Sequence, residues 1–401
     1  MKLSITFILI TLVIDAMGIG LILPVLPSLI RDVTGGDLAH AAVWGGILST
    51  SFAVMQFLFG PMLGNLSDRF GRRPVLLVSM AVVAVDYLVM ALAGTIWLLL
   101  ISRMVGGVAA GTQSTATAFI ADISKPEEKA ARFGLIGAAF GIGFIAGPVL
   151  GGFLAEFGSR WPFYAAGALA ALNLLLGAAV LPETVTDAIR RPFEWRRANP
   201  FGALAQIRRL PGLGRLLILF FLYEFAFIVY PAIWAYFGQA RFGWSTGMVG
   251  LSLASFGVAM AVVQGGLIKI VMARLGERGT ILYGIAFNFA AFLFLALVSN
   301  PVLALVMTPV TALGAVVTPA LQGMMSKLSA ANQQGEVQGI LTSVRSVAWI
   351  LSPLVMTQIF AAFTGPAAPV FLPGAPFLLS MALMVVCGAV FLLGAPRKIT
   401  A

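Results

Sequence analysis

Long runs of apolar residues, separated by short polar gaps, dominate this chain of 401 residues. A helix that crosses a lipid bilayer needs about 20 mostly apolar residues. The pattern predicts twelve such helices, six in each half of the chain. In the first half they are expected near 4–24, 42–63, 74–94, 97–119, 132–154 and 162–181. In the second half they are expected near 213–236, 247–270, 279–298, 301–325, 337–361 and 374–394.

The two halves repeat each other at a fixed distance of 205 residues. The matched landmarks are Gly134 with Gly339, Gly147-Pro148 with Ser352-Pro353, and residues 69–73 with residues 274–278. Such a repeat predicts an all-helical membrane protein built from two six-helix bundles, with a substrate path between them. The bundles are predicted at 1–182 and 211–401, joined by a polar, Arg-rich linker at 183–210.

Composition and charge agree with a membrane protein. Hydrophobic residues make up 60% of the chain and charged residues 10%, whereas soluble domains carry about 25% charged residues. The net charge of +10 lies in short gaps between apolar runs, without the basic stripe that nucleic-acid binding needs. With one cysteine (Cys387) and one histidine (His40), neither a disulfide framework nor a multi-histidine metal site is expected within the chain.

The distribution of Lys and Arg predicts the orientation. The apolar run after Met1-Lys2 is interpreted as a first membrane helix, because it is long for a signal peptide and lacks a small-x-small cleavage site. With the N-terminus inside, about twenty basic residues fall on the inner side, whereas the outer loops hold Arg31, Arg160 and Arg241. Both termini are therefore expected in the cytoplasm.

Two motifs stand out in the first half. The loop between the second and third helices combines glycines for a tight turn with an acid among arginines. Its residues are Gly64, Asp68, Arg69, Gly71, Arg72 and Arg73, and they are interpreted as a gate rather than a loop that only sets topology. The fifth helix carries small residues that let another helix approach closely, and the other half is the expected partner. These residues are Gly143, Gly147, Pro148, Gly151 and Gly152.

Charged residues inside membrane spans are costly and indicate function. They are Asp15, Asp86, Arg103, Glu224 and Arg345. For Arg103 the alternative is a structural ion pair with an acid, and for Asp15 and Asp86 it is a polar contact between helices. A carboxylic acid shielded from water holds its proton more tightly, which suits proton coupling. Asp15 and Glu224 are predicted to form the proton site, with Asp86 as a further acid and Arg103 tuning it.

The gate loop resembles the signature loop of the major facilitator superfamily, and the resemblance extends over the whole chain. Gly147-Pro148 with Gly151-Gly152 is similar to the antiporter motif of drug:proton exchangers, and Arg103 with Gly107 and Gly111 resembles their fourth-helix motif. The resemblance implies a secondary transporter that uses a proton gradient, with no cofactor. It also implies that Asp68 and Arg72 lock the cytoplasmic side in one of two states.

Longer strings resemble the tetracycline-resistance efflux proteins. They run over residues 15–27, 67–77, 242–244, 249–254 and 319–323. The resemblance implies export of a drug-like molecule, in that family a divalent-metal chelate of tetracycline, in exchange for protons. It assigns functional charges to Asp15, Asp68, Arg72, Asp86, Arg103 and Asp122, with Asp122 counted among the gate residues, and a polar position to Gln264. The chain departs from the family at Met260, where a histidine is expected, and at Asn288, where an aspartate is expected.

The substrate cavity is expected to be apolar with few polar anchors. The candidate anchors are Gln56, Gln113, Gln264 and Asn288, with aromatic walls from helices seven and eight. For each anchor the alternative is a hydrogen bond between helices.

The predicted function is a monomeric inner-membrane exporter of an amphipathic small molecule, whose partners are substrate, protons and lipid. The alternatives are an uncoupled or differently coupled transporter of another metabolite, or a sensor on this scaffold. An enzyme is not expected, because the chain has no nucleophile–base pair, P-loop, dinucleotide fingerprint or zinc spacing.

Overall fold

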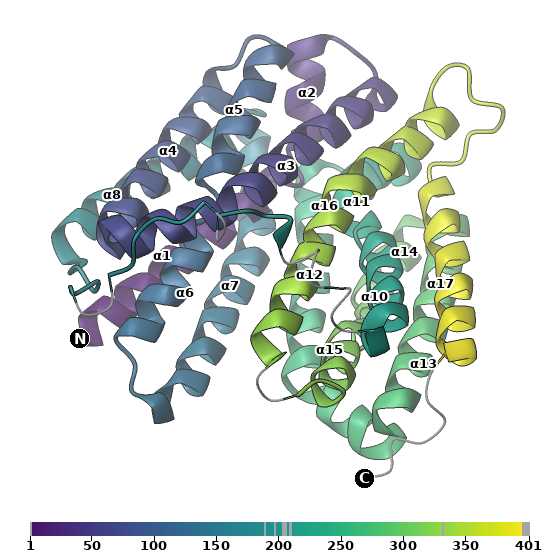
Figure 1. Cartoon of the computed structure of the whole chain (residues 1–401). Helices are drawn as coiled ribbons and strands as arrows, with labels where there is room; N and C mark the ends of the chain where they lie inside the picture. Colours follow the sequence, from purple (N-terminus) through teal and green to yellow (C-terminus); the bar gives the residue numbers. More distant parts are fainter. Residues whose placement is uncertain are drawn as a thin grey trace. The chain divides into compact units, whose positions relative to one another are not determined.

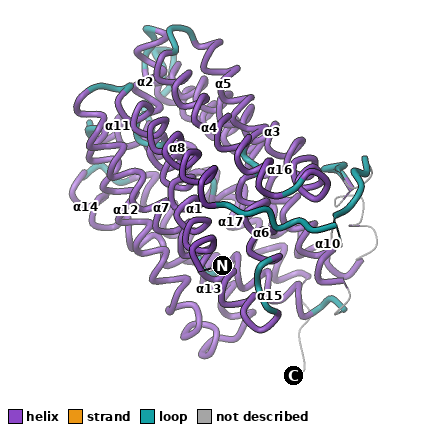
Figure 2. The backbone as a smooth tube through the Cα atoms, turned by 90° about the vertical axis from the view of Figure 1, so that its left-hand side faces the viewer, coloured by secondary structure: helices purple, strands orange, loops and turns teal. Residues whose placement is uncertain are grey.

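The computed structural model describes residues 2–187, 190–195, 198–202, 207, 211–330 and 333–394. Helices and loops make up all of this described part, which contains no strand (Figures 1 and 2). The all-helical membrane fold predicted from the apolar pattern is confirmed. The chain divides into two compact units, and each is described by itself.

Unit 1 consists of Met1–Pro200 together with Trp244–Ala254. Its helices lie in the purple to blue part of Figure 1. They are α1 (Lys2–Ile22), α2 (Leu26–Thr34), α3 (Leu38–Phe70), α4 (Arg72–Leu92), α5 (Ile96–Ala109), α6 (Thr112–Asp122), α7 (Pro126–Leu154) and α8 (Trp161–Val180). The start of α12 (Thr246–Val262) belongs to this unit as far as Ala254.

Unit 2 consists of Phe201–Gly243 and Ser255–Ala401. After the remainder of α12 comes one π-helical turn, Val263–Leu267. The further helices are α10 (Gly214–Phe227), α11 (Val229–Phe242), α13 (Ile268–Leu297), α14 (Pro301–Thr311), α15 (Val317–Lys327), α16 (Gln334–Thr364) and α17 (Ala375–Gly394).

Each of the twelve predicted spans falls on helix in the structure. By length and composition, eleven stretches of the described residues could cross a membrane, because Thr246–Leu297 counts as one stretch of 52 residues. That stretch covers the predicted spans eight and nine, and its backbone leaves helical geometry between them at Gly276 (φ 66°, ψ 176°). The fourth, seventh and tenth spans are each divided into two shorter helices. The structure also has a helix that the apolar pattern missed, the nine-residue α2.

The sequence repeat is visible in the contacts between the first and fifth helices of each half. In unit 1, Gly147 of α7 lies against Gly20 of α1. In unit 2, the Ser352 hydroxyl of α16 donates a hydrogen bond to the Phe225 carbonyl of α10, at 2.7 Å. Phe225 and Ser352 each follow their counterparts by 205 residues. The same two helices therefore pack at the same level in both halves.

The glycine face of α7 packs mainly within its own half. The backbone carbonyls of α1 cover Gly143, Gly147 and Gly151, so the expectation that these three face the other half is wrong. Gly152 lies against Gly247, which comes from the second half of the sequence and belongs to unit 1. Helices can approach this closely because glycine lacks a Cβ atom, and the contact is made by backbone atoms.

A methyl group at Gly147 should destabilise the protein. A Cβ there would lie 2.5 Å from the Met17 carbonyl oxygen and 2.8 Å from the Gly20 Cα atom. Because the obstructing atoms belong to the backbone, α1 and α7 would have to separate, and overpacking of this kind costs about 1–3 kcal/mol. Gly147→Ala should lower the thermal unfolding midpoint in detergent.

The matched control is Gly141→Ala, on the same helix, where a Cβ would meet no atom within 4 Å. This change should be neutral or slightly stabilising, since alanine favours helix by about 1 kcal/mol over glycine. Equal midpoints for the two variants would contradict the proposed close packing of α1 on α7.

Candidate functional site

Three clusters of charged and polar side chains lie within the two units. The first is the gate loop of unit 1, where α3 ends and α4 begins. The Arg72 guanidinium donates hydrogen bonds to the Asp68 carboxylate, to the Ser67 hydroxyl at 2.6 Å and to the Asp122 carboxylate at 3.1 Å. Asp122 is the last residue of α6. One arginine therefore holds together the ends of three helices, and the predicted gate residues Asp68, Arg72 and Asp122 do meet.

A residue that the sequence reasoning missed completes this cluster. The Glu183 carboxylate accepts hydrogen bonds from the backbone N–H groups of Arg72 at 2.9 Å and Arg73 at 3.3 Å, at the start of α4. A helix N-terminus has free N–H groups and favours negative charge. Gly71 has φ 111°, and a Cβ there would collide with the Glu183 carboxylate, so only glycine fits. The available signal was an acid directly after the sixth span, in what was taken as linker.

The other gate residues play different parts. The Arg73 side chain donates to the Ala178 carbonyl at 2.7 Å and so ties α4 to α8. Arg69 is exposed, with its guanidinium 5.1 Å from the centre of the Phe70 ring. A Cβ at Gly64 would meet no atom within 4 Å, so this position shows no steric need for glycine in the structure.

The second cluster lies inside the predicted membrane spans of unit 1. The Arg103 guanidinium on α5 lies 3.8 Å from the Asp86 carboxylate on α4 and stacks over the Phe52 ring, at 4.1 Å from the ring centre. The Ser102 hydroxyl donates to the same carboxylate. A Cβ at Gly106 would lie 2.5 Å from an Asp86 oxygen, so glycine makes room for the acid. Arg103 therefore does form an ion pair with an acid inside the spans, which was the structural alternative to a functional role.

Asp15 on α1 is the acid of this region that has no ion pair or hydrogen bond among the described residues. Tyr87 on α4, which is buried, follows Asp86 directly in the chain. The Tyr87 hydroxyl packs against Gly18, one turn along α1 from Asp15, in space that any larger residue would fill. This packing holds α4, which carries Asp86, against the helix that carries Asp15.

The third cluster lies in unit 2 and centres on Glu224 of α10. Its carboxylate accepts two hydrogen bonds from the Arg345 guanidinium of α16, at 3.1 and 3.3 Å, and one from the Thr318 hydroxyl of α15, at 2.8 Å. Glu224 is buried, whereas the Arg345 side chain is 41% exposed. The sequence analysis placed Glu224 and Arg345 inside membrane spans but did not predict that they form an ion pair. Nothing in the sequence indicated that Thr318 would contact Glu224.

Asn288 is completely buried beside this cluster. Its amide donates to the Tyr223 hydroxyl at 3.1 Å and to the carbonyls of Gly284 and Gly314, both at 2.9 Å. Its side-chain oxygen has no hydrogen-bond partner among the residues that the structure describes. Asn288 therefore makes the helix–helix contact that was the alternative to substrate binding, and substrate could reach it only if this network opened.

The predicted glutamine anchors lie in different settings. Gln56 on α3 and Gln264 in the π-helical turn are both exposed. The Gln264 amide lies 3.8 Å from the sulfur of Met260. The side chain of Gln113 lies outside the described residues. Single π-helical turns often occur at functional sites, and the position of Gln264 in such a turn agrees with its prediction as an anchor.

One aromatic residue of the predicted seventh helix, Tyr230, belongs to a packed aromatic cluster of unit 2. The Tyr230 ring lies 5.1–6.1 Å from the rings of Phe256, Phe292 and Phe377. Phe292 and Phe377 are fully buried, and Tyr230 is nearly so. Tyr230 therefore packs inside the unit, whereas Phe221, Phe225 and Phe227 of the same predicted helix are only partly buried, and the aromatic cavity walls stay a prediction.

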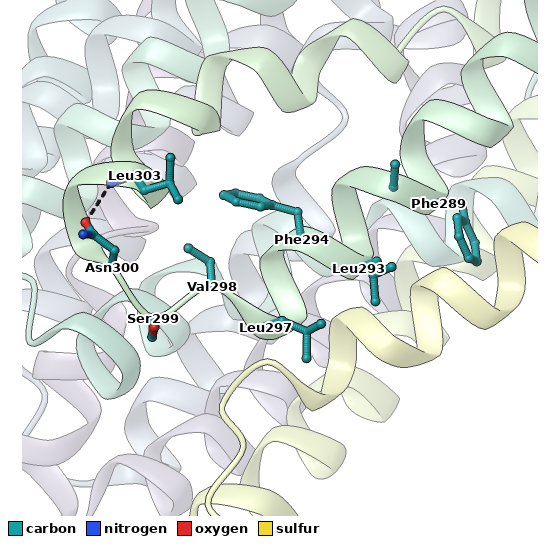
Figure 3. A pocket seen from close by; sticks show the side chains of 9 residues that line it. Phe289, Leu293, Phe294, Leu297, Val298, Ser299, Asn300 and Leu303 are labelled. Carbon is teal, nitrogen blue, oxygen red and sulfur yellow. Dashed lines mark hydrogen bonds between the residues drawn. The ribbon is translucent and has the colours of Figure 1, made fainter.

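A hollow of about 490 Å³ lies where α13 is followed by α14, and its lining side chains are drawn in Figure 3. Its lining is mostly apolar and includes Phe289, Leu293 and Phe294. The Asn300 side chain points to the start of α14, where it accepts hydrogen bonds from the N–H groups of Val302 and Leu303. None of the predicted site residues lines this hollow, so the candidate site lies in the three charged clusters.

Comparison with known proteins places this arrangement in a family. The sequence profile of the Major Facilitator Superfamily matches residues 8–353. The chain is 40% identical over 352 residues to the class C tetracycline resistance protein of Escherichia coli, which covers 88% of each chain. It is 41% identical over 354 residues to the class G protein of Vibrio anguillarum, covering 88% of this chain and 89% of the relative.

The crystal structure of the human organic anion transporter MFSD10 (TETRAN) is similar, with a TM-score of 0.70 and 28% identity, over 97% of this chain and 99% of the other. The chain is a multi-pass membrane protein that belongs to the major facilitator superfamily of transporters, as a relative of the tetracycline resistance proteins.

Proposed function

We propose that this protein is a secondary active transporter that exports a tetracycline-like amphipathic molecule in exchange for protons, from a bacterial inner membrane. The observation that carries the proposal is the set of carboxylates at membrane depth, in a chain related to tetracycline resistance proteins over 88% of its length. Acids are too costly in a membrane span to persist without a use. The proton gradient supplies the energy for export, and the proposal involves no cofactor.

The pattern of ion pairs gives the three acids different roles. Asp86 and Glu224 are each held by an arginine, so proton binding to either one must weaken an existing bond. Asp15 is without such a partner among the described residues. A charged carboxylate without a partner is costly in apolar surroundings, and binding a proton or a cationic substrate removes that cost. Asp15 and Glu224 are the proposed proton site, and Arg103 adjusts it through Asp86.

Alternating access requires two states of comparable free energy, and ligands shift their populations. The gate residues Asp68, Arg72 and Asp122 are proposed to stabilise one state on the cytoplasmic side, with Glu183 fixing the start of α4. Gln56, Gln113 and Gln264 are the proposed polar anchors of the substrate, which would be a divalent-metal chelate as in the tetracycline family. Asn288 contributes only if its buried network opens.

Three observations favour a second candidate, an exporter of organic anions. The Arg345 guanidinium keeps one nitrogen, Nη1, free of the bonds to Glu224, and the side chain is 41% exposed. An arginine can bind a carboxylate through two parallel hydrogen bonds. The name of the similar human structure also refers to organic anions, and Met260 and Asn288 replace the titratable groups of the tetracycline family.

Flux in proteoliposomes tests the proposal. Purified protein should accumulate a tetracycline with Mg²⁺ in vesicles when a pH gradient is imposed, and should lose this accumulation when an ionophore removes the gradient. Transport of an organic anion, but not of the tetracycline, would favour the second candidate. Flux that ignores the pH gradient would indicate an uncoupled transporter, and the absence of flux for the whole panel would argue against the function.

Asp68→Asn should slow export severalfold while leaving membrane insertion intact. The change removes the charge that Arg72 contacts at the end of α3, so the gated state loses an interaction worth about 1 kcal/mol or less, which shifts the balance of the two states by up to about fivefold. Asp187→Asn is the matched control, because Asp187 is an almost fully exposed acid paired with Arg190 at 3.8 Å. Normal export by Asp68→Asn would count against the gate.

Glu224→Gln should uncouple transport, so that substrate equilibrates across the membrane but no longer accumulates under a pH gradient. The single change also leaves Arg345 without its counter-charge, and an unpaired charge inside a membrane span is costly and can impair folding. The double variant Glu224→Gln/Arg345→Gln removes both charges and should recover expression without recovering accumulation. If either well-expressed variant accumulates substrate as the parent does, Glu224 is not the coupling acid.

Gln264→Ala should raise the substrate concentration needed for half-maximal flux, with little effect on expression. Gln264 is exposed and makes only a weak contact with the Met260 sulfur, so its loss leaves few bonds unsatisfied. Gln338→Ala, at an exposed glutamine of α16, serves as the control. An unchanged concentration dependence for Gln264→Ala would remove this residue from the substrate site.

A further inference from the structure

Both units contain an ion pair between the start of their third helix and the end of their fourth, and the two pairs have opposite polarity. In unit 1, Arg72 contacts Asp122 at 3.1 Å. In unit 2, Glu277 contacts Lys327 at 2.7 Å. Glu277 and Lys327 each follow their counterparts by 205 residues. We term Arg72–Asp122 the first latch and Glu277–Lys327 the second latch.

The backbone around the two latches is alike. Gly71 directly precedes Arg72 with φ 111° and ψ 153°, and Gly276 directly precedes Glu277 with φ 66° and ψ 176°. Positive φ at these glycines turns the chain between two helices in both units. Each latch therefore joins the first residue after such a turn to the last turn of a neighbouring helix.

The charges of the two latches have opposite relations to the helix ends. Helix N-termini favour negative charge and C-termini favour positive charge. In the second latch, Glu277 follows the turn that starts a helix, and Lys327 is the last residue of α15, so both charges are favoured. In the first latch, Arg72 starts α4 and Asp122 ends α6, so both charges are disfavoured.

The contacts around each latch reflect this difference. Arg72 has further bonds to Asp68 and Ser67, and Glu183 supplies the negative charge at the start of α4. At the corresponding positions of unit 2, Ala273 replaces Asp68 and Met272 replaces Ser67, so neither can accept a side-chain hydrogen bond in the same way. Gly323 of α15 lies beside the Glu277 carboxylate, where a Cβ would be 3.6 Å from its oxygen.

The two side chains of the second latch differ in their exposure to solvent. The Glu277 side chain is 13% exposed and the Lys327 side chain 65% exposed. A fully exposed ion pair contributes little, because water screens it. Loss of Lys327 would leave Glu277 as a mostly buried carboxylate without its counter-charge, which is more costly than loss of a surface pair.

We propose that the second latch is a standing brace, which keeps α13 and α15 together throughout the transport cycle, whereas the first latch opens and closes. Glu277 and Lys327 are positioning residues, since they hold helices and do not touch the substrate. The first latch depends on Asp68, Ser67 and Glu183 and is lost when these contacts change. The second latch needs no such support. The inference rests on the proposed transport function.

Cross-linking tests the proposal, and the chain suits it because its one cysteine, Cys387, is buried. In a Cys387→Ser background, Glu277→Cys/Lys327→Cys and Arg72→Cys/Asp122→Cys would each be bridged with a short bifunctional thiol reagent and assayed for flux. Before bridging, the unit 2 variant should be slowed by about threefold or more, as expected for a lost partly buried ion pair. Bridging should restore its rate, whereas the bridged unit 1 variant should stay inactive.

Two results would overturn the proposal. If the bridge between residues 277 and 327 blocks transport, the second latch must open during the cycle. If the unbridged variant transports like the parent, the brace is dispensable. Lys327→Arg should keep the parent rate and Lys327→Gln should not, while Asp187→Asn, which breaks an exposed pair, should have no effect.

A readout that needs no substrate separates this inference from the proposed function. Hydrogen exchange of the parent should be slow at residues 324–327, the last turn of α15, and faster at residues 119–122, the last turn of α6. Lys327→Gln should accelerate exchange at residues 324–327. This result would support the brace even if flux assays found no substrate, whereas equal exchange at the two latches would contradict it.

Discussion

The cost of an unpaired charge in a lipid bilayer is the constraint on which the rest of this structure depends. Water solvates a carboxylate well and hydrocarbon does not, so a charged side chain in a span needs a partner or a proton. Asp86 meets this need with Arg103 and Ser102, and Glu224 meets it with Arg345 and Thr318. Each pair joins different helices, so the same bonds that solvate the charges also fix the helix positions. Asp15 has no such bond in the described residues.

The same physics operates differently where the helices end. There the charges meet backbone groups that the helix itself leaves unsatisfied. Glu183 accepts hydrogen bonds from the N–H groups at the start of α4. The neighbouring Gly71 leaves room for the Glu183 carboxylate because glycine has no side chain. Arg72 then lies between acids from two further helices. A loop of this kind has several interactions that must be made or lost together, which suits a gate with two states.

The sequence predicted the spans well because a bilayer imposes a length and an apolar composition that a single sequence reveals. It assigned Asp68, Arg72 and Asp122 to one gate through resemblance, but spacing alone could not predict that residues of α3 and α6 contact each other. It missed the roles of Glu183 and Thr318, and the pairing of Glu224 with Arg345, because these contacts join residues more than 90 positions apart. Composition also does not distinguish a packed aromatic residue such as Tyr230 from one that lines an open space.

If carboxylates at membrane depth exchange a proton for substrate, substrate binding must release protons. The release can be measured in weakly buffered detergent solution near neutral pH, with a pH indicator and saturating tetracycline–Mg²⁺. We expect binding to the parent to release protons, and Asp15→Asn to release fewer at equal occupancy. Saturable binding to the parent with no proton release would contradict exchange at these carboxylates.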